Sequence, residues 1–268
     1  MKKELIKTFD EYLKNFDLKD KDILREYNHS IRVMSLCENI AKDEKLSKDD
    51  INLSIVSGLV HDIGRFTQWT LYHSYNDLLT IDHGDLGEEL LKNSLIKKFW
   101  SKKEDYSSIL KSVKYHNKRD LNAEFTPREL LITKVVRDAD KIDILHLYLT
   151  VELEFNENSE ISEAAKNDFL GRKLVNHKNV KTDADIVLRT LAFVFDLNFD
   201  YSFSYLKENK TIERLFELIK DKKKFKFYFD YVKNYIDDKL NIWKTAKNSC
   251  CFYYSYGKIF LWLLWKQT

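Results

Sequence analysis

Residues that break helices are scarce along this chain. Only 1 Pro and 6 Gly occur in 268 residues, so few positions favour a kink or a tight turn. Hydrophobic residues make up 44% of the chain, which is enough for a substantial buried core. These features predict an all-α fold.

The charge balance excludes some classes of partner. Lys and Arg number 45 against 43 Asp and Glu, which argues against a dedicated nucleic-acid coat or a polybasic membrane binder. Cys37 and the pair Cys250-Cys251 have neither metal-site nor disulfide spacing, which indicates a reducing compartment. The first residues lack the apolar core of a signal peptide, and the apolar stretch Ile259–Trp265 is too short to span a bilayer. We therefore expect a cytoplasmic protein without a membrane segment.

Apolar residues recur at helical spacing along the first part of the chain. Ser47 with Asp50, Asp85, and Thr126 before Pro127 are expected to start helices. Thr67–Asp82 lacks periodicity and predicts a loop or a broken helix. The expected helices are Glu4–Phe16, a segment from Asp20 or Asp22 to about Lys42, Asp50–Val60, Leu86–Leu95, Tyr106–His116, and one from Pro127 through Asp143.

The second part of the chain carries less recognisable chemistry. Val151–Asn158 is acidic and irregular, and further helices are expected over Ser162–Val175, Ala184–Phe195 and Thr211–Lys220. Lys222–Tyr231 interleaves Lys with aromatics, which suits single-stranded nucleic acid. The spacing of Phe225, Phe229, Val232 and Ile236 fits an amphipathic core helix, and this interpretation is favoured. Phe260, Leu261, Trp262, Leu264 and Trp265 are expected to dock on the domain or to form a dimer face.

One dipeptide, His61-Asp62, follows the apolar run Ile55–Val60 and is therefore expected inside the protein. An adjacent imidazole and carboxylate can share a metal, or can form a buried hydrogen-bonded pair with no metal. Gly64 is expected to allow a sharp backbone turn, and Arg65 brings a guanidinium suited to phosphate.

Other candidate ligands lie on helices. His29 shares the apolar stripe of Val33, Leu36 and Ile40, so it is either a core histidine or a ligand. The segment from Arg137 to Asp143 holds three acids in an apolar helix, where burial without cations is costly. We expect some of these acids at the surface and at least one at a metal. Two residues apart, Asp138 and Asp140 point to nearly opposite faces, so only one should bind it.

Taken together, the motifs follow the order His29, His61-Asp62, His83, His116, Asp140. This order resembles the HD superfamily of metal-dependent phosphohydrolases, whose pattern is His, His-Asp, Asp. The matching segments are Asn28–Val33, His61–Gly64 and Asp138–Lys141, and His83 and His116 match the two-metal subset. The resemblance covers about residues 20–150.

The resemblance implies an all-helical metal-binding domain over residues 1–150, with residues 151–268 as a helical extension packed on it. It implies one or two divalent metal ions (Mn, Fe, Mg, Ni or Co). One would bind His29, His61, Asp62 and Asp140. The other would bind His83 and His116, with Asp62 bridging. Asp138 would support the site from behind, and Arg65, Lys118, Arg137 and Lys141 are candidates to hold phosphate oxygens beside the catalytic Asp62.

The function that these expectations favour is metal-dependent hydrolysis of a small phosphorylated substrate such as a nucleotide. A first alternative is a mixed-valent di-iron oxygenase, since such enzymes share the same order of ligands. A second is a non-catalytic, metal-stabilised module that binds nucleic acid or another ligand, which the balanced charge makes the least favoured.

Overall fold

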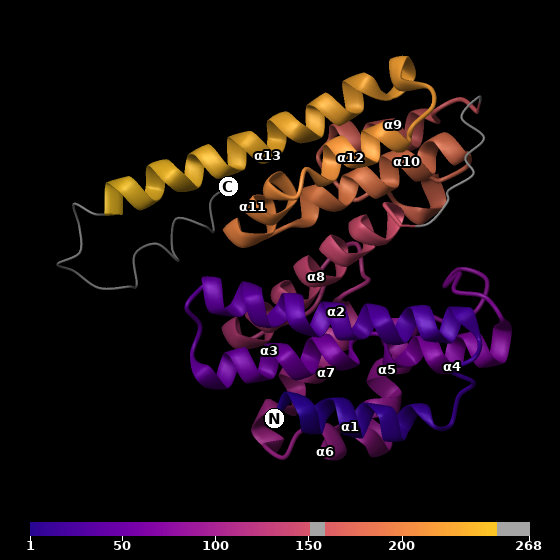
Figure 1. Cartoon of the computed structure of the whole chain (residues 1–268), viewed down its shortest axis with the longest axis vertical. Coiled ribbons are helices and arrows are strands. Elements are labelled where there is room, and N and C mark those ends of the chain that lie inside the picture. The colour runs from indigo at the N-terminus through magenta and orange to yellow at the C-terminus, as the bar shows by residue number, and fades with distance from the viewer. Residues whose placement is uncertain (151–158, 251–268) are drawn as a thin grey trace.

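The computed structural model describes residues 1–150 and 159–250, and within these ranges it contains helices and no strands (Figure 1). The all-α prediction is confirmed. The first group of helices is α1 (Lys2–Leu13), α2 (Lys21–Asp43), α3 (Lys48–Val60), α4 (Ile63–Tyr72), α5 (His83–Leu90), α6 (Ile96–Phe99) and α7 (Tyr106–Tyr115). There follow α8 (Pro127–Tyr148), α9 (Glu163–Leu170), α10 (Asp183–Ala192), α11 (Asp200–Glu208), α12 (Thr211–Leu218) and α13 (Lys222–Cys250).

Helix starts follow local capping chemistry. The Ser47 side chain accepts from the Asp50 backbone N–H, and Thr126 and Glu129 form a capping box at α8. At α5 the prediction was wrong: Asp82, and not Asp85, accepts from the first free backbone N–H groups, so the helix begins at His83. Over residues 67–82, where a loop or a broken helix was expected, the structure has the broken helix: α4 continues to Tyr72 and an irregular segment follows it.

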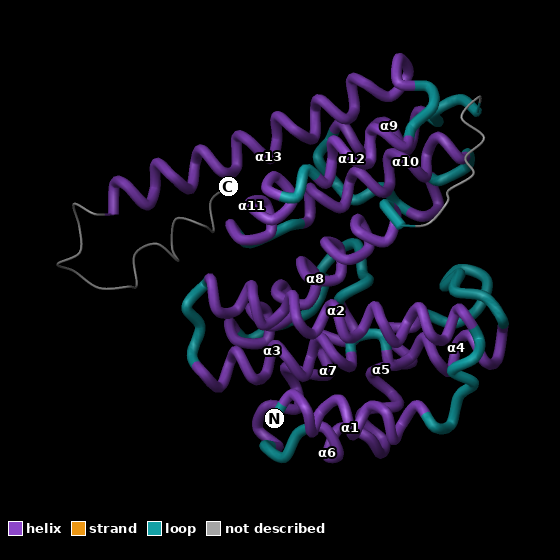
Figure 2. Tube along the Cα trace, in the orientation of Figure 1, coloured by secondary structure: helices purple, strands orange, loops and turns teal. Residues whose placement is uncertain are grey.

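The helices form two blocks joined by α8. In Figure 1, α1–α7 lie in the lower block, α9–α13 lie in the upper block, and α8 runs between them. Figure 2 shows that loops and turns connect the ends of the helices. One core cluster lies within the lower block, and the other combines α2 and α8 with α9–α13. The two blocks therefore share apolar contacts through α2 and α8.

Helix α13 buries its apolar face. Phe225, Phe229, Val232 and Ile236 are all buried, as the amphipathic interpretation predicts. These aromatic rings cannot stack on nucleic-acid bases while they lie in the core. Val151–Asn158, Cys251 and the aromatic stretch Phe260–Trp265 lie outside the described residues. Within the described ranges, none of the helices combines the length and apolar character needed to cross a membrane.

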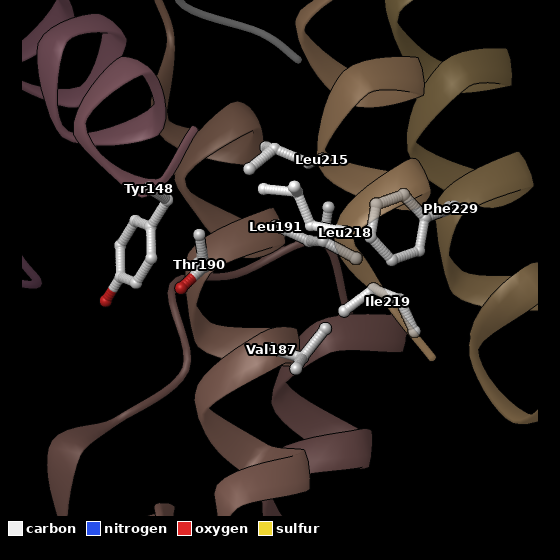
Figure 3. A pocket seen from close by; sticks show the side chains of 8 residues that line it. All are labelled: Tyr148, Val187, Thr190, Leu191, Leu215, Leu218, Ile219 and Phe229. Carbon is white, nitrogen blue, oxygen red and sulfur yellow. The ribbon is translucent and has the colours of Figure 1, made fainter. Parts of the chain in front are cut away.

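A small apolar hollow lies in the upper block (Figure 3). Its volume of about 30 Å³ is room for about one water molecule. It is lined by Tyr148, Val187, Thr190, Leu191, Leu215, Leu218, Ile219 and Phe229.

Candidate metal centre

Six side chains, each on or next to a different helix, converge in the lower block. His29 lies on α2 and His61 follows the last residue of α3. Asp62 precedes α4, and His83 begins α5. His116 follows the last residue of α7, and Asp140 lies on α8. All six are buried, with exposed fractions of 0% (His61) to 6% (Asp140), so their polar atoms depend on one another or on a bound ion.

The first group is His29, His61, Asp62 and Asp140, whose ligand atoms all lie within 4.8 Å of one another. The His29 Nε2 is 3.2 Å from the His61 Nε2 and 3.2 Å from the Asp140 Oδ1. The Asp62 Oδ2 is 3.5 Å from the His29 Nε2 and 3.4 Å from the His61 Nε2. Two imidazoles and two carboxylates therefore point at one centre.

A second group is formed by Asp62, His83 and His116. The Nε2 atoms of the two imidazoles are 3.0 Å apart. The Asp62 Oδ1 lies 3.3 Å from the His83 Nε2 and 3.2 Å from the His116 Nε2. The two oxygens of Asp62 thus face different groups, which is the arrangement of a carboxylate that bridges two ions.

The outer nitrogens of all four imidazoles are already engaged. The Nδ1 of His61 donates to the Gly58 carbonyl at 2.8 Å, and the Nδ1 of His116 donates to the Val113 carbonyl at 2.7 Å. The Nδ1 of His29 is 2.6 Å from Asp143, and that of His83 is 2.7 Å from Asp77. When the ring is neutral, each bond fixes the tautomer that presents a Nε2 lone pair to the interior, as metal-binding histidines do.

The site fits a divalent metal ion. Donors about 2.1 Å from a common centre lie about 3.0–3.4 Å apart in tetrahedral or octahedral geometry, which matches most of these separations. The Asp62 Oδ1 is also buried without a hydrogen-bond partner, a costly state that a cation would relieve. Imidazole and carboxylate donors suit several divalent metals.

Close backbone packing positions the His-Asp pair. A Cβ on Gly64 would lie 2.3 Å from the His83 carbonyl oxygen, so only glycine lets α4 approach α5 there. The expected turn at Gly64 was wrong, because Gly64 is helical and the turn falls at Asp62, with φ −103° and ψ 22°.

Charge is concentrated in the centre. Burial raises the pKa of the Asp62 carboxyl, but the surrounding histidines, His61 and His83 foremost, outweigh burial and hold that pKa well below its usual range. Burial lowers the pKa of His29, and the carboxylates of Asp140, Asp143 and Asp62 reverse this and raise it well above its usual value. For His116, burial prevails and lowers the pKa to about 4.

Among the expected phosphate ligands, Arg65 lies beside the centre. Its Nε is 3.8 Å from the Asp62 Oδ1, and its Nη1 donates to the Tyr75 carbonyl and to Asp77. Burial lowers the Arg65 pKa, but the carboxylates of Asp62 and Asp77 raise it overall, so the guanidinium stays charged.

The other three cations are bound elsewhere. The Lys118 ammonium pairs with Asp82 at 2.6 Å and Asp85 at 3.2 Å. Buried Lys141 pairs with Asp196 at 3.0 Å, in the upper block. Arg137 pairs with Asp196 at 2.7 Å and donates to backbone carbonyls at the end of α7. None of these cations pairs with the carboxylates of Asp62 or Asp140, because other carboxylates and backbone carbonyls, including that of His116, hold them.

The three acids of the segment from Arg137 to Asp143 are all buried, so the expectation that some reach the surface was wrong. Asp140 and Asp143 face the histidines. Asp138 lies on the opposite face, where backbone N–H groups of Asn198 and Phe199 and the Ser202 hydroxyl donate to it. It does not support the metal ligands. Burial raises the Asp138 pKa to about 6.

Sequence reasoning missed three acids beside the centre. Asp143 holds His29 and accepts two bonds from Arg32, and its position three residues after Asp140 on one helix face could have revealed it. Buried Glu26 lies three residues before His29, where burial and the charge of Asp62 raise its pKa. Asp77 comes from an irregular segment that gave no signal.

The family comparison agrees with this geometry. Residues 27–147 match the model of the HD domain. This part of the chain is an HD domain. The HD domain is typical of the metal-dependent phosphohydrolase superfamily, whose members are generally hydrolases, and its buried cluster indicates divalent-metal binding. Neither the curated proteins nor the solved structures contain a match to the chain.

Proposed function

We propose that the chain is a metal-dependent phosphohydrolase that cleaves a phosphate ester of a nucleotide or another small phosphorylated metabolite. One observation carries the proposal. Four imidazoles, each tied at Nδ1, direct their Nε2 atoms at the two oxygens of one carboxylate, Asp62. Divalent ions held by such donors lower the pKa of a bound water and neutralise phosphate oxygens during in-line attack.

The chain itself supplies positioning and charge. Arg65 is held by Tyr75 and Asp77, so its remaining N–H groups are preorganised to bind a phosphate oxygen next to Asp62. Glu26 has a raised pKa, so its carboxyl can hold a proton close to Asp62 and Arg65. Asp143 and Asp77 keep the His29 and His83 rings in place.

The test combines metal content with turnover. Full-length protein is analysed for bound metals and then assayed with Mn, Mg, Co, Ni or Fe on nucleotides, cyclic dinucleotides and an aryl phosphate diester. We expect phosphate release or diester cleavage, and a loss of about 10³-fold or more in Asp62→Asn, because the shared ligand is removed. Asp49→Asn, the same change at an exposed acid, serves as the control and should retain full activity.

Two results would contradict the proposal. One is the absence of turnover with every metal and substrate class. The other is a protein that carries two irons and consumes oxygen with a polyol or a hydroxyphosphonate, which would identify an oxygenase instead.

A further inference from the structure

A second, polar hollow lies where the segment after α7 meets the upper block. Its volume is about 410 Å³, within the range of roughly 300–1,000 Å³ typical of small-molecule sites. Arg119 and Asp120 line it from the segment after α7, Arg172 and Lys173 from the segment after α9, and Phe195 and Asp196 from the turn after α10. None of the six candidate metal ligands lines it.

Two of the lining cations, Arg172 and Lys173, have no carboxylate partner among the described residues. The Arg172 guanidinium lies 5.5 Å from the centre of the Tyr231 ring and 5.2 Å from that of Tyr235, and its Nε donates to the Tyr231 hydroxyl at 3.1 Å. Phenol rings orient a guanidinium without neutralising it. Among the described residues, neither Arg172 nor Lys173 forms an ion pair with a carboxylate.

The backbone of Arg172 is strained. Its φ is 54°, in the left-handed region that a residue with a Cβ seldom adopts, whereas the preceding Gly171 has an ordinary φ of −74°. Glycine is the usual residue in this conformation after a helix. The chain thus places a large cation where glycine would cost less, and such strain concentrates at ligand sites.

The charge around the hollow is positive. Asp196 is neutralised by Arg137 and Lys141, and Arg119 pairs with Asp168 at 3.0 Å. Counting the lining residues and these direct partners gives five cations (Arg119, Arg172, Lys173, Arg137, Lys141) and three carboxylates (Asp120, Asp196, Asp168), a net charge of +2. Two guanidinium groups and an ammonium around one hollow suit several phosphate oxygens at once.

We propose that this hollow binds a small anion that carries two or more phosphate groups. Inorganic pyrophosphate and the polyphosphate of a nucleotide share this chemistry. The site is separate from the metal centre, so its occupancy does not depend on the reaction proposed above.

The test is equilibrium binding to the full-length chain in excess EDTA, which removes metal-mediated binding of phosphate. The probes are inorganic pyrophosphate, ATP and inorganic phosphate, each titrated calorimetrically at moderate salt. We expect pyrophosphate or ATP to bind with a Kd below about 1 mM and more tightly than phosphate, and to weaken as salt is raised. Tighter binding of ATP than of pyrophosphate would support a nucleotide as the source, and equal binding would support the pyrophosphate group alone.

Substitutions in the lining test whether the polyphosphate binds in this hollow. Lys173→Gln removes one charge, and Arg172→Gly removes a guanidinium while relieving the strained backbone. Each should weaken pyrophosphate or ATP binding by about tenfold or more, because a charge-assisted contact is lost. Lys92→Gln, the same change at an exposed lysine of the lower block, should bind as the unaltered chain does. A Kd above about 1 mM for both polyphosphates, or equal affinity in all variants, would overturn the proposal.

Discussion

The two faces of α8 use the same residue type for different purposes. Asp140 faces His29 and His61 across gaps of 3.2 and 3.6 Å, in a centre where the Asp62 Oδ1 has no hydrogen-bond partner. Asp138, on the opposite face, accepts from Asn198, Phe199 and Ser202. A buried carboxylate whose oxygens all accept hydrogen bonds stabilises the packing of the helices that it joins. A group of buried donors and acceptors with atoms left unsatisfied indicates a ligand site.

The largest effect is expected when each of the two acids is removed in turn. Asp138→Ala should lower the free energy of unfolding by about 3 kcal/mol, because it leaves several buried donors at the start of α11 without an acceptor. Metal affinity should remain. Asp140→Asn should have the reverse pattern, with metal binding lost and a smaller loss of stability. Urea denaturation of the metal-free chain and metal titration measure the two effects.

Two results would contradict these separate roles. One is an Asp138→Ala variant that loses metal binding and keeps its stability. The other is an Asp140→Asn variant that is less stable than Asp138→Ala.

A smaller effect is expected from the carboxylates that hold the histidines. Asp143→Asn and Asp77→Asn weaken the bonds that fix the His29 and His83 rings, so each should lower metal affinity by about 10–100-fold. The control is Asp168→Asn, which makes the same change at a half-buried acid of the upper block. Asp168 accepts hydrogen bonds from Asn176 and Asn179. Affinities that match the control would show that these two acids have no part in orienting the rings.

The smallest effect concerns pH. The carboxylates around His29 raise its pKa in the metal-free protein, so the ring holds a proton that a metal must displace. Burial lowers the pKa of His61, but the carboxylates of Asp62 and Asp140 outweigh burial and raise that pKa as well. Metal affinity should therefore rise with pH, by up to about tenfold per pH unit for each proton released, until His29 and His61 are neutral, whereas His116, with a pKa of about 4, releases none near neutral pH. Protonated His29 also stabilises the metal-free fold. This stabilisation is fully present at pH values below the pKa of His29 in the unfolded chain, and it is lost as the pH rises through the higher pKa of His29 in the folded chain. Calorimetric metal titration in two buffers of different ionisation enthalpy measures the proton release, and an affinity that is flat with pH would contradict it.

Much of the fold and of the centre could be predicted from local patterns. The Thr126-Pro127 start, the apolar stripe that carries His29 and the order of histidines and aspartates are properties of short segments. Each limits the local structure directly, and the structure gathers the six candidate ligands into two groups that share Asp62.

The predictions that were wrong concern side chains whose partners lie far away in the sequence. Helical spacing gave the opposite faces of Asp138 and Asp140, but nothing in the sequence showed that α11, itself not predicted, supplies donors to Asp138. Likewise, Lys141 follows a candidate ligand in sequence, yet Asp196, 55 positions later, holds its ammonium. Spacing along a helix says which way a side chain points and leaves open what lies there.

Arg137 connects the matched residues 27–147 to the upper block. Its buried guanidinium bonds to the carbonyls of Tyr115, His116 and Lys118 on one side and to Asp196 on the other. If the chain were cut after residue 147, a buried positive charge would lose its counterion directly behind the candidate ligand His116. We therefore expect the smallest part of the chain that keeps an intact metal centre to extend beyond residues 27–147 and to include Asp196.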